Sequence, residues 1–450
     1  MARNFLHLAI PEVLNRAARL ATAILLARFL TLHAYSVFNI GIAAAGLAGT
    51  LTTLGLPEIG ARDVAIDVGL IGWLSGRVVT ARATAISVLL VAAAVIALAV
   101  HSGALPTIVA VGCMVLCVGV SADWLLRGLE RMRPLGLATA AGGLTVFAGS
   151  LLVIAVDRSA VAALALFAVG EAVAATLCWR AARPLSLRLG YRGLAPLLRR
   201  SWPVALSTLA FQAYYANVDT LIIAGTRSVD EAGLYSAAYR VFLTLNVVSI
   251  FAAIALLPLL ARARHAEQHE VADRILARSL LPLVGYGLIA LGAAELFGRT
   301  LLSGLFGARF GGMNHVLDVL CIGLMWYTVG YPAGYAFIAS SKNRRYLAGA
   351  ATAAVLNVGL NVILIPRIGA IGAAIATAVA FGAACFVWLG LQGLLLESAR
   401  WLVLLLIAAS VAAIIAVKAS GVTGPVGVAT ALVGIILSTS SARALIRQTG

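Results

Sequence analysis

The residues of this sequence most able to do chemistry are charged side chains inside apolar runs. The first run carries four polar residues spaced i, i+3, i+4 and i+7, which form one stripe on a helix: Glu12, Asn15, Arg16 and Arg19. An ionisable group at a bilayer centre costs about 2.5–3.5 kcal/mol on insertion scales, so such a stripe must face protein or water. Because arginine binds phosphate oxygens bidentately, the stripe is a candidate cationic wall of a cavity. The alternative is that it snorkels to head groups at the interface.

Other charged and amide side chains interrupt later apolar runs. Asp219, with Asn217 beside it, and Arg240 lie in consecutive runs, where they would form a structural ion pair or part of a substrate site. Glu171 stands alone in its run, which favours proton transfer or helix packing. Both alternatives stay open for each.

Two pairs of polar residues have helical i, i+4 spacing. Asp123 and Arg127 are expected to neutralise each other, although Asp123 is also a candidate for ion coupling. Asn357 and Asn361 share one helix face, which favours hydrogen bonds between helices.

Signals for catalysis or metal binding are weak. His265 and His269 are four residues apart in a charged segment, a spacing typical of a solvated face. The five cysteines lie in apolar runs without metal-ligand spacing and are expected to be unpaired core residues. The sequence contains no glycine-rich nucleotide-binding loop. We therefore expect no enzyme activity, no catalytic residue, no metal site and no nucleic-acid partner.

Composition identifies the elements that must position these residues. Hydrophobic residues make up 62% of the 450 residues, charged residues 11%, and the mean hydropathy is +1.02. Soluble domains are about 45–50% apolar and about 25% charged, which excludes a soluble enzyme, a disordered scaffold and a secreted disulfide module. Apolar runs near the length of a spanning helix predict an all-α polytopic membrane protein. We expect the first segment to remain in the mature protein, because Arg16 and Arg19 interrupt it.

Fourteen segments are long and apolar enough to be transmembrane helices. They lie near residues 9–30, 37–56, 78–100, 108–126, 135–156, 160–179, 202–223, 238–260, 280–301, 316–339, 346–365, 369–396, 401–417 and 425–445. With a cytoplasmic N-terminus, 23 basic residues fall on the cytoplasmic side and seven on the other. This asymmetry predicts a multi-pass protein with both termini in the cytoplasm.

The chain is expected to contain two related lobes. The predicted parts are an N-lobe of helices 1–6 (1–183), a basic cytoplasmic linker (184–200), a C-lobe of helices 7–12 (201–396) and two further helices (397–450). Tyr35-Ser36 matches Tyr235-Ser236, and residues 160–163 match residues 370–373. Six helices separate the copies, so the repeats share one topology and imply a pseudo-two-fold axis along the membrane normal.

Several segments resemble the Wzx-like oligosaccharide flippases, the polysaccharide transporter family of the multidrug/oligosaccharidyl-lipid/polysaccharide exporter superfamily. They include residues 26–30 and 54–63, which contain Arg28 and Arg62, and residues 201–219, 232–240, 257–258, 357–366 and 369–377. The resemblance implies a plasma-membrane (inner-membrane) flippase that translocates a polyprenyl-diphosphate-linked oligosaccharide by alternating access, for lipopolysaccharide or exopolysaccharide export. It implies no cofactor, and coupling to protons or sodium ions through Asp219, Glu171 or Asp123.

The same resemblance implies where the substrate binds. Arg16, Arg19, Arg240, Asn217, Arg28 and Arg62 become candidate substrate ligands, and membrane lipids, a polysaccharide polymerase and chain-length machinery become candidate partners. The alternatives are a lipid II flippase, a multidrug cation antiporter of the same superfamily, and a subunit that organises polysaccharide polymerases. A cation antiporter favours an acidic cavity, whereas these runs carry arginines.

Overall fold

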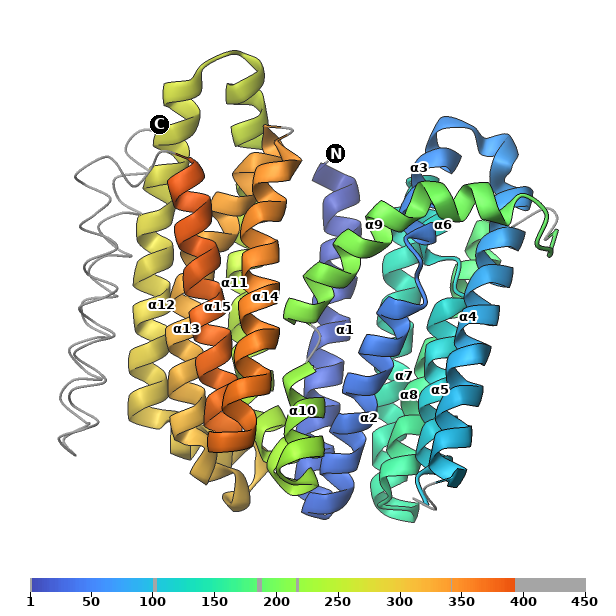
Figure 1. Cartoon of the computed structure of the whole chain (residues 1–450), viewed down its shortest axis with the longest axis vertical. Coiled ribbons are helices and arrows are strands. Elements are labelled where there is room, and N and C mark those ends of the chain that lie inside the picture. Colours follow the sequence, from blue (N-terminus) through green and yellow to red (C-terminus); the bar gives the residue numbers. More distant parts are fainter. Residues whose placement is uncertain (1, 100–102, 184–187, 216–217, 341, 393–450) are drawn as a thin grey trace. The chain divides into compact units, whose positions relative to one another are not determined.

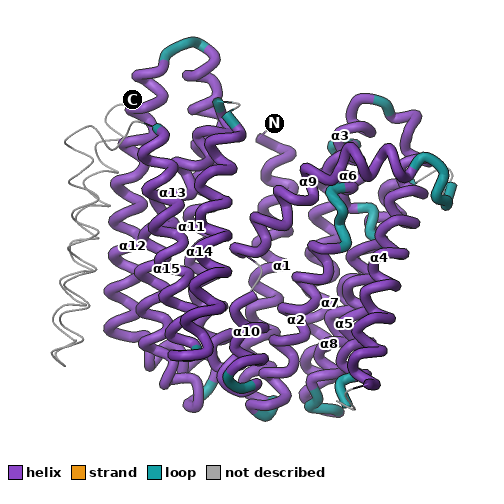
Figure 2. Tube along the Cα trace, in the orientation of Figure 1, coloured by secondary structure: helices purple, strands orange, loops and turns teal. Residues whose placement is uncertain are grey.

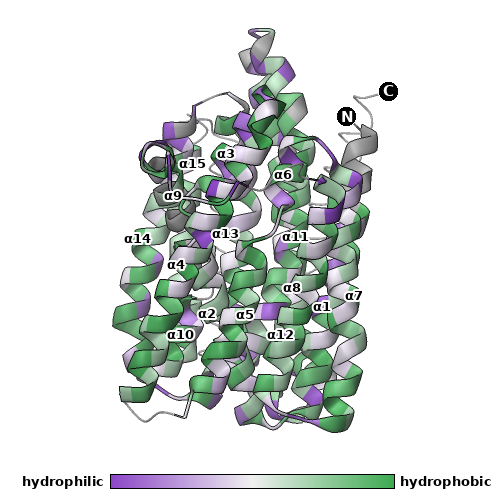
Figure 3. Cartoon of the chain, turned by 90° about the vertical axis from the view of Figure 1, so that its right-hand side faces the viewer, coloured by the Kyte–Doolittle hydropathy of each residue, from purple (hydrophilic) through white to green (hydrophobic). Residues whose placement is uncertain are grey.

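The structure is a computed structural model that describes residues 2–99, 103–183, 188–215, 218–340 and 342–392. Every regular element in these ranges is a helix, which confirms the all-α prediction (Figures 1 and 2). Ten of the helical segments are long and apolar enough to cross a membrane. Figure 3 colours the ribbon by hydropathy and shows that apolar residues predominate along the long helices. The last two predicted helices lie outside the described residues.

The chain divides into two compact units, Met1–Ala224 and Gly225–Gly450. The helices of the first unit are α1 (Ala2–Phe29), α2 (Leu32–Leu51), α3 (Leu56–Ile66), α4 (Ile71–Ala99), α5 (Leu105–Gly119), α6 (Asp123–Gly128), α7 (Met132–Val156), α8 (Ala160–Ala182) and α9 (Leu194–Tyr215). Helix α10 (Val218–Thr226) crosses the division. The second unit contains α11 (Val229–His265), α12 (His269–Phe306), α13 (Asn314–Ala339), α14 (Asn343–Ile368) and α15 (Ala370–Leu391).

Two features of the observed helices differ from the prediction. The helix expected over residues 108–126 is broken into α5 and α6. Helix α3 is an additional element between α2 and α4. It starts where Gly55 takes a left-handed φ of 66°, with Pro57 in its first turn, where a missing N–H leaves no helical bond unmade.

In the first unit α7 packs between α1 and α8, and α8 also packs on α5. Glycines allow the closest crossing, since a Cβ added to Gly142 of α7 would lie 2.8 Å from the Gly170 carbonyl oxygen of α8. Small residues bring spanning helices together in this way because packing, rather than water exclusion, drives their association in lipid.

In the second unit α13 is the central helix and packs against α11, α12 and α15. Glycines again line the contact, with Gly330 of α13 against Cys385 and Gly334 against Trp388 of α15. Helices α11 and α12 have 37 and 38 residues. At 1.5 Å per residue each is about 56 Å long, well beyond the roughly 30 Å hydrocarbon core, and their hairpin projects past the other helices of the unit (Figure 1).

Candidate functional site

Arg19 of α1 forms an ion pair inside the first unit. Its Nη2 lies 2.6 Å from Oε1 of Glu171 on α8, and its Nε donates to Oδ1 of Asn15 at 3.0 Å. The two charged side chains are 27% and 18% exposed, so the pair is largely withdrawn from the surface. Glu171 is the lone charge of its own apolar run, and its partner comes from another helix. Its partner is 152 positions away in sequence, beyond the reach of helical spacing.

Packing fixes the position of this pair. The Arg19 guanidinium lies 5.5 Å from the ring centroid of Phe167, one turn from Glu171 on α8. On the other side, Asn15 is buried against α7, where a Cβ on Gly143 would lie 2.4 Å from its Oδ1. Three helices therefore hold the guanidinium in place.

The other arginines of α1 have different surroundings. Arg16 is paired with Glu12 at 2.8 Å, and both side chains are substantially exposed. Arg28 is exposed in the last turn of α1, where a cation interacts favourably with the helix dipole. The stripe is thus split, because Arg19 points into the unit and Arg16 does not. The choice between a cavity wall and an interfacial position stays open for Arg16.

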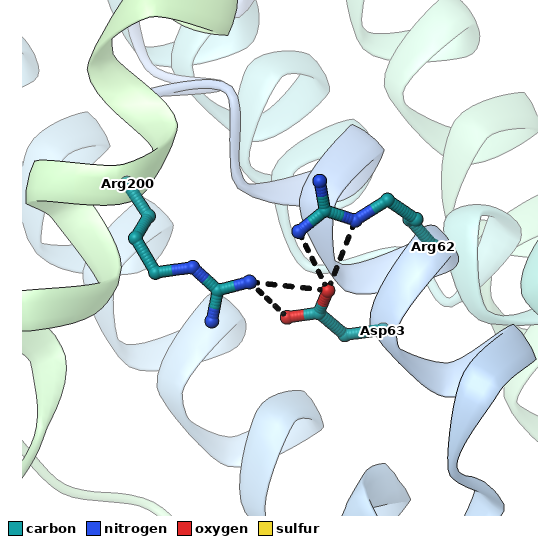
Figure 4. Close-up of polar contacts among 3 residues, drawn as sticks. All are labelled: Arg62, Asp63 and Arg200. Carbon is teal, nitrogen blue, oxygen red and sulfur yellow. Dashed lines mark hydrogen bonds and ion pairs between the residues drawn. The ribbon is translucent and has the colours of Figure 1, made fainter.

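Arg62 belongs to a three-residue cluster that joins α3 to α9 (Figure 4). Its Nη2 lies 2.9 Å from Oδ1 of Asp63, and Nη2 of Arg200 lies 3.1 Å from the other oxygen of the same carboxylate. Asp63 is 11% exposed, whereas both arginines extend to the surface. One carboxylate thus accepts from two arginines, and Arg200 is a member that the motifs did not reveal.

The predicted pair of Asp123 and Arg127 on α6 is confirmed. A neighbouring cation was missed as a candidate: Arg82 falls inside the helix predicted over residues 78–100, although the count of 23 cytoplasmic basic residues includes it, and in the structure it lies within α4 at 3% exposure. Its Nε has no hydrogen-bond partner within the described ranges, and Asp123 and Glu58 act on it electrostatically. The signal in the sequence was its position four residues after Val78, on the buried face of α4.

The predicted pairing of Asp219 with Arg240 stays a prediction. Asp219 is buried at the start of α10 and accepts the backbone N–H of Thr220 at 2.8 Å. Arg240 lies on α11, in the second unit. Asn217 lies outside the described residues.

A buried polar group lies between α14 and α15. Asn361 donates to Oδ1 of Asn357 at 3.0 Å, and Nδ2 of Asn357 lies 3.4 Å from the hydroxyl of Thr377 on α15. The predicted hydrogen bonding between helices is therefore confirmed. All three residues are buried, so these contacts offset part of the cost of placing amides in an apolar interior, while Oδ1 of Asn361 has no hydrogen-bond partner among the described residues.

The five cysteines are unpaired, as predicted, and three of them are buried. The expectation that all five are core residues is wrong, because Cys113 is exposed on α5 and Cys117 is half-buried. The structure contains no cluster of three metal-ligating side chains in the ranges it describes.

Comparison with known proteins adds the family. A family model described as polysaccharide biosynthesis protein matches residues 1–264. The chain belongs to this family. One relative of this polysaccharide biosynthesis protein is the probable low-salt glycan biosynthesis flippase Agl15 of Haloferax volcanii, 27% identical over 170 residues. That match covers 37% of this chain and 36% of the relative, so it spans little more than a third of the archaeal protein.

Solved structures share the fold. The lipid II flippase MurJ in an inward closed conformation has a TM-score of 0.73 and 13% identity, with 98% of this chain and 99% of that chain covered. An inward-facing multidrug-resistance MATE transporter of the MOP superfamily has a TM-score of 0.67 and 16% identity, covering 88% and 98%. At these identities the likeness establishes the fold, that of a multi-pass membrane protein.

Proposed function

We propose that the protein is a flippase that moves a polyprenyl-diphosphate-linked oligosaccharide across the plasma membrane for surface polysaccharide assembly. The family membership supports the biosynthetic role, and the transporter fold supports translocation. The observation that carries the proposal is Arg19, a guanidinium held by three helices inside an apolar unit. A diphosphate and a sugar chain do not cross hydrocarbon unaided, and an arginine fork is suited to the phosphate oxygens.

In the proposed mechanism Glu171 is the resident counter-ion of Arg19. The substrate diphosphate takes the place of this carboxylate, so Arg19 keeps an anionic partner with the site empty or filled. Protonation of Glu171 would favour the exchange, which links translocation to protons. Asp219 and Asp123 remain alternative coupling residues for protons or sodium ions. Arg16, Arg240, Asn217, Arg28 and Arg62 are the further proposed substrate contacts.

In this proposal the units alternate access to the two leaflets, and both termini are cytoplasmic. The polyprenyl tail stays in lipid while the head group crosses. A polysaccharide polymerase and chain-length machinery would receive the product in the outer leaflet.

The test is complementation of surface polysaccharide in a strain that lacks the gene. Charge-assisted hydrogen bonds contribute about 1.5–3 kcal/mol each, so Arg19→Ala and Arg240→Ala are each expected to weaken substrate binding roughly tenfold to a hundredfold. Arg19→Lys should retain part of the activity, because the charge remains and the planar fork is lost. Arg274→Ala removes an exposed arginine of α12 and serves as the control. Full activity of both Arg19→Ala and Arg240→Ala at normal protein abundance would contradict the proposal.

A lipid II flippase is the second candidate, favoured by the TM-score of 0.73 to MurJ. The two substrates share a polyprenyl diphosphate and differ in the sugar-peptide part. Purified protein in vesicles distinguishes them by the protection of labelled lipid II or of a labelled lipid-linked oligosaccharide from an external enzyme. Faster flipping of lipid II would replace the oligosaccharide assignment while leaving the role of Arg19 intact.

A further inference from the structure

One end of the first unit exposes large apolar side chains beside arginines. Five apolar residues there are each at least 60% exposed: Ile66, Val68, Leu189, Tyr191 and Trp202. Ile66 ends α3, Val68 lies in the turn before α4, and Leu189 and Tyr191 lie in the segment that leads into α9; these three parts of the chain lie at one end of the unit in Figure 1. Trp202 lies within α9. Most other strongly exposed apolar residues of this unit lie along helices that span the membrane, where lipid covers them.

The backbone of the segment 188–193 is hydrogen-bonded to side chains in the first turns of α4. Arg77 of α4 donates to two carbonyl oxygens of the segment, that of Arg188 at 2.6 Å and that of Arg192 at 3.0 Å. The N–H of Gly190 donates to the hydroxyl of Thr80 at 3.1 Å. These bonds occupy the backbone of the segment and leave its own charged side chains unused.

The fit is close as well as polar. A Cβ on Gly76 would lie 2.0 Å from the carbonyl oxygen of Arg188, and one on Gly193 would lie 2.9 Å from the Trp73 ring. The hydroxyls of Tyr191 and Thr84 are 2.9 Å apart. The segment is therefore a rigid platform with a fixed orientation.

Two arginines of this segment, Arg188 and Arg192, and Arg199 of α9 have no ion pair within the described residues. Arg188, Arg192 and Arg199 are all exposed. Arg200, next in sequence, shows the contrast, since it binds Asp63. Three arginines without acids, set among exposed aliphatic and aromatic side chains, have the composition of a surface that lies in a membrane interface.

We infer that these eight residues (Ile66, Val68, Arg188, Leu189, Tyr191, Arg192, Arg199 and Trp202), here termed the basic cap, bind anionic lipid head groups of the cytoplasmic leaflet. The apolar side chains enter the head-group layer, and the arginines pair with lipid phosphates. Only the name of the leaflet rests on the proposed orientation.

The first experiment measures stabilisation by lipid in the full-length purified protein. Thermal unfolding is followed in detergent while phosphatidylglycerol or phosphatidylcholine is added, because a ligand that binds the folded state raises the unfolding temperature. Each basic residue near an anionic surface contributes about 1 kcal/mol, so Arg188→Gln/Arg192→Gln/Arg199→Gln is expected to lose roughly a hundredfold in phosphatidylglycerol affinity. The matched control, Arg158→Gln/Arg299→Gln/Arg367→Gln, removes the same charge elsewhere and should keep the wild-type affinity.

The second experiment tests insertion of the apolar side chains. The protein is placed in vesicles of equal parts phosphatidylcholine and brominated phosphatidylglycerol, in which the bromine atoms quench nearby tryptophans. The part of the tryptophan fluorescence that the lipid quenches should be smaller in Trp202→Phe than in the wild type. In the unfolding experiment, equal stabilisation of the wild type by phosphatidylglycerol and phosphatidylcholine would overturn the inference. Equal stabilisation of the triple variant and its control by phosphatidylglycerol would overturn it as well. Farnesyl diphosphate, added in the same unfolding measurement, tests whether the basic cap binds a prenyl diphosphate instead of a membrane lipid. Stabilisation by farnesyl diphosphate but not by phosphatidylglycerol would also overturn the inference. None of these measurements involves flipping, so failure of the proposed function would leave them unaffected.

Discussion

At the scale of single residues, the informative feature is a charged pair that sequence spacing does not reveal. Asp123 with Arg127, and Asn357 with Asn361, are four residues apart, and helical geometry alone brings each pair together. Arg19 and Glu171 meet only because α1 and α8 both pack on α7. Local contacts of the site were thus predictable, whereas its central contact depends on tertiary packing.

Variants of the Arg19–Glu171 pair are expected to change the stability of the protein and its flipping activity independently. Glu171→Gln leaves the half-buried guanidinium without its anion and should lower the free energy of unfolding by about 1–3 kcal/mol. Arg19→Met/Glu171→Met removes both charges and should recover much of that loss in stability, while flipping should be slowed because the substrate ligand Arg19 is gone. Thermal unfolding of purified protein and vesicle flipping assays measure the two effects. A double variant that flips at the wild-type rate would show that the pair is structural only.

Removing the charge of Arg82 is expected to change the free energy of unfolding in the opposite direction. A buried guanidinium whose Nε lacks a partner in the described structure carries a desolvation cost, so Arg82→Met should leave the protein equally stable or stabilise it by about 1–3 kcal/mol. Arg77→Met is the contrasting variant, because Arg77 donates to two backbone carbonyls and its loss should destabilise. Thermal unfolding measures both. Strong destabilisation by Arg82→Met would mean that Arg82 already has a structural anionic partner.

At the scale of elements, the sequence predicted long apolar helices well and their interruptions poorly. Hydropathy averages over a window, so it does not register the break between α5 and α6 at residues 120–122. In the sequence, only Gly55 and Pro57 mark the start of the short helix α3, and both lie in the segment 54–63 that resembles the flippases. Breaks of this kind position Asp63 and Asp123, the acids of two charged clusters.

At the junction of α14 and α15, adding one methyl group to Gly369 is expected to lower the stability of the protein. Gly369 has a φ of 65°, and a Cβ there would lie 2.0 Å from Oε1 of Glu231, which caps α15 by accepting the N–H of Ala370 at 2.7 Å. Gly369→Ala should therefore destabilise by more than about 1 kcal/mol through strain and loss of the cap. Gly359→Ala, in α14 with open space around it, should be neutral or stabilising by up to about 1 kcal/mol. Equal unfolding temperatures for the two variants would contradict this account.

At the scale of the molecule, the predicted repeat has matching local structure in the two units. Tyr35 and Tyr235 are both fully buried. The serines that follow them, Ser36 and Ser236, both donate to the carbonyl four residues earlier, at 2.8 and 2.7 Å. The second matched pair of segments likewise begins a helix in each unit, α8 and α15. The same-topology repeat stays a prediction with which these local matches are consistent.

The orientation of the chain is the remaining molecular prediction, and it follows from charge. Placing Arg82 inside α4 changes the predicted distribution of basic residues from 23 against seven to 22 against seven, so the predicted asymmetry remains. Basic residues near spanning helices resist translocation, and we therefore expect the richer side to be cytoplasmic. Reporter fusions after Arg192 and after Lys342 should give cytoplasmic signals, and one after Asp157, between α7 and α8, an extracytoplasmic signal. A cytoplasmic signal at Asp157 would reverse the orientation or change the number of crossings before α8, and the basic cap would then face another leaflet.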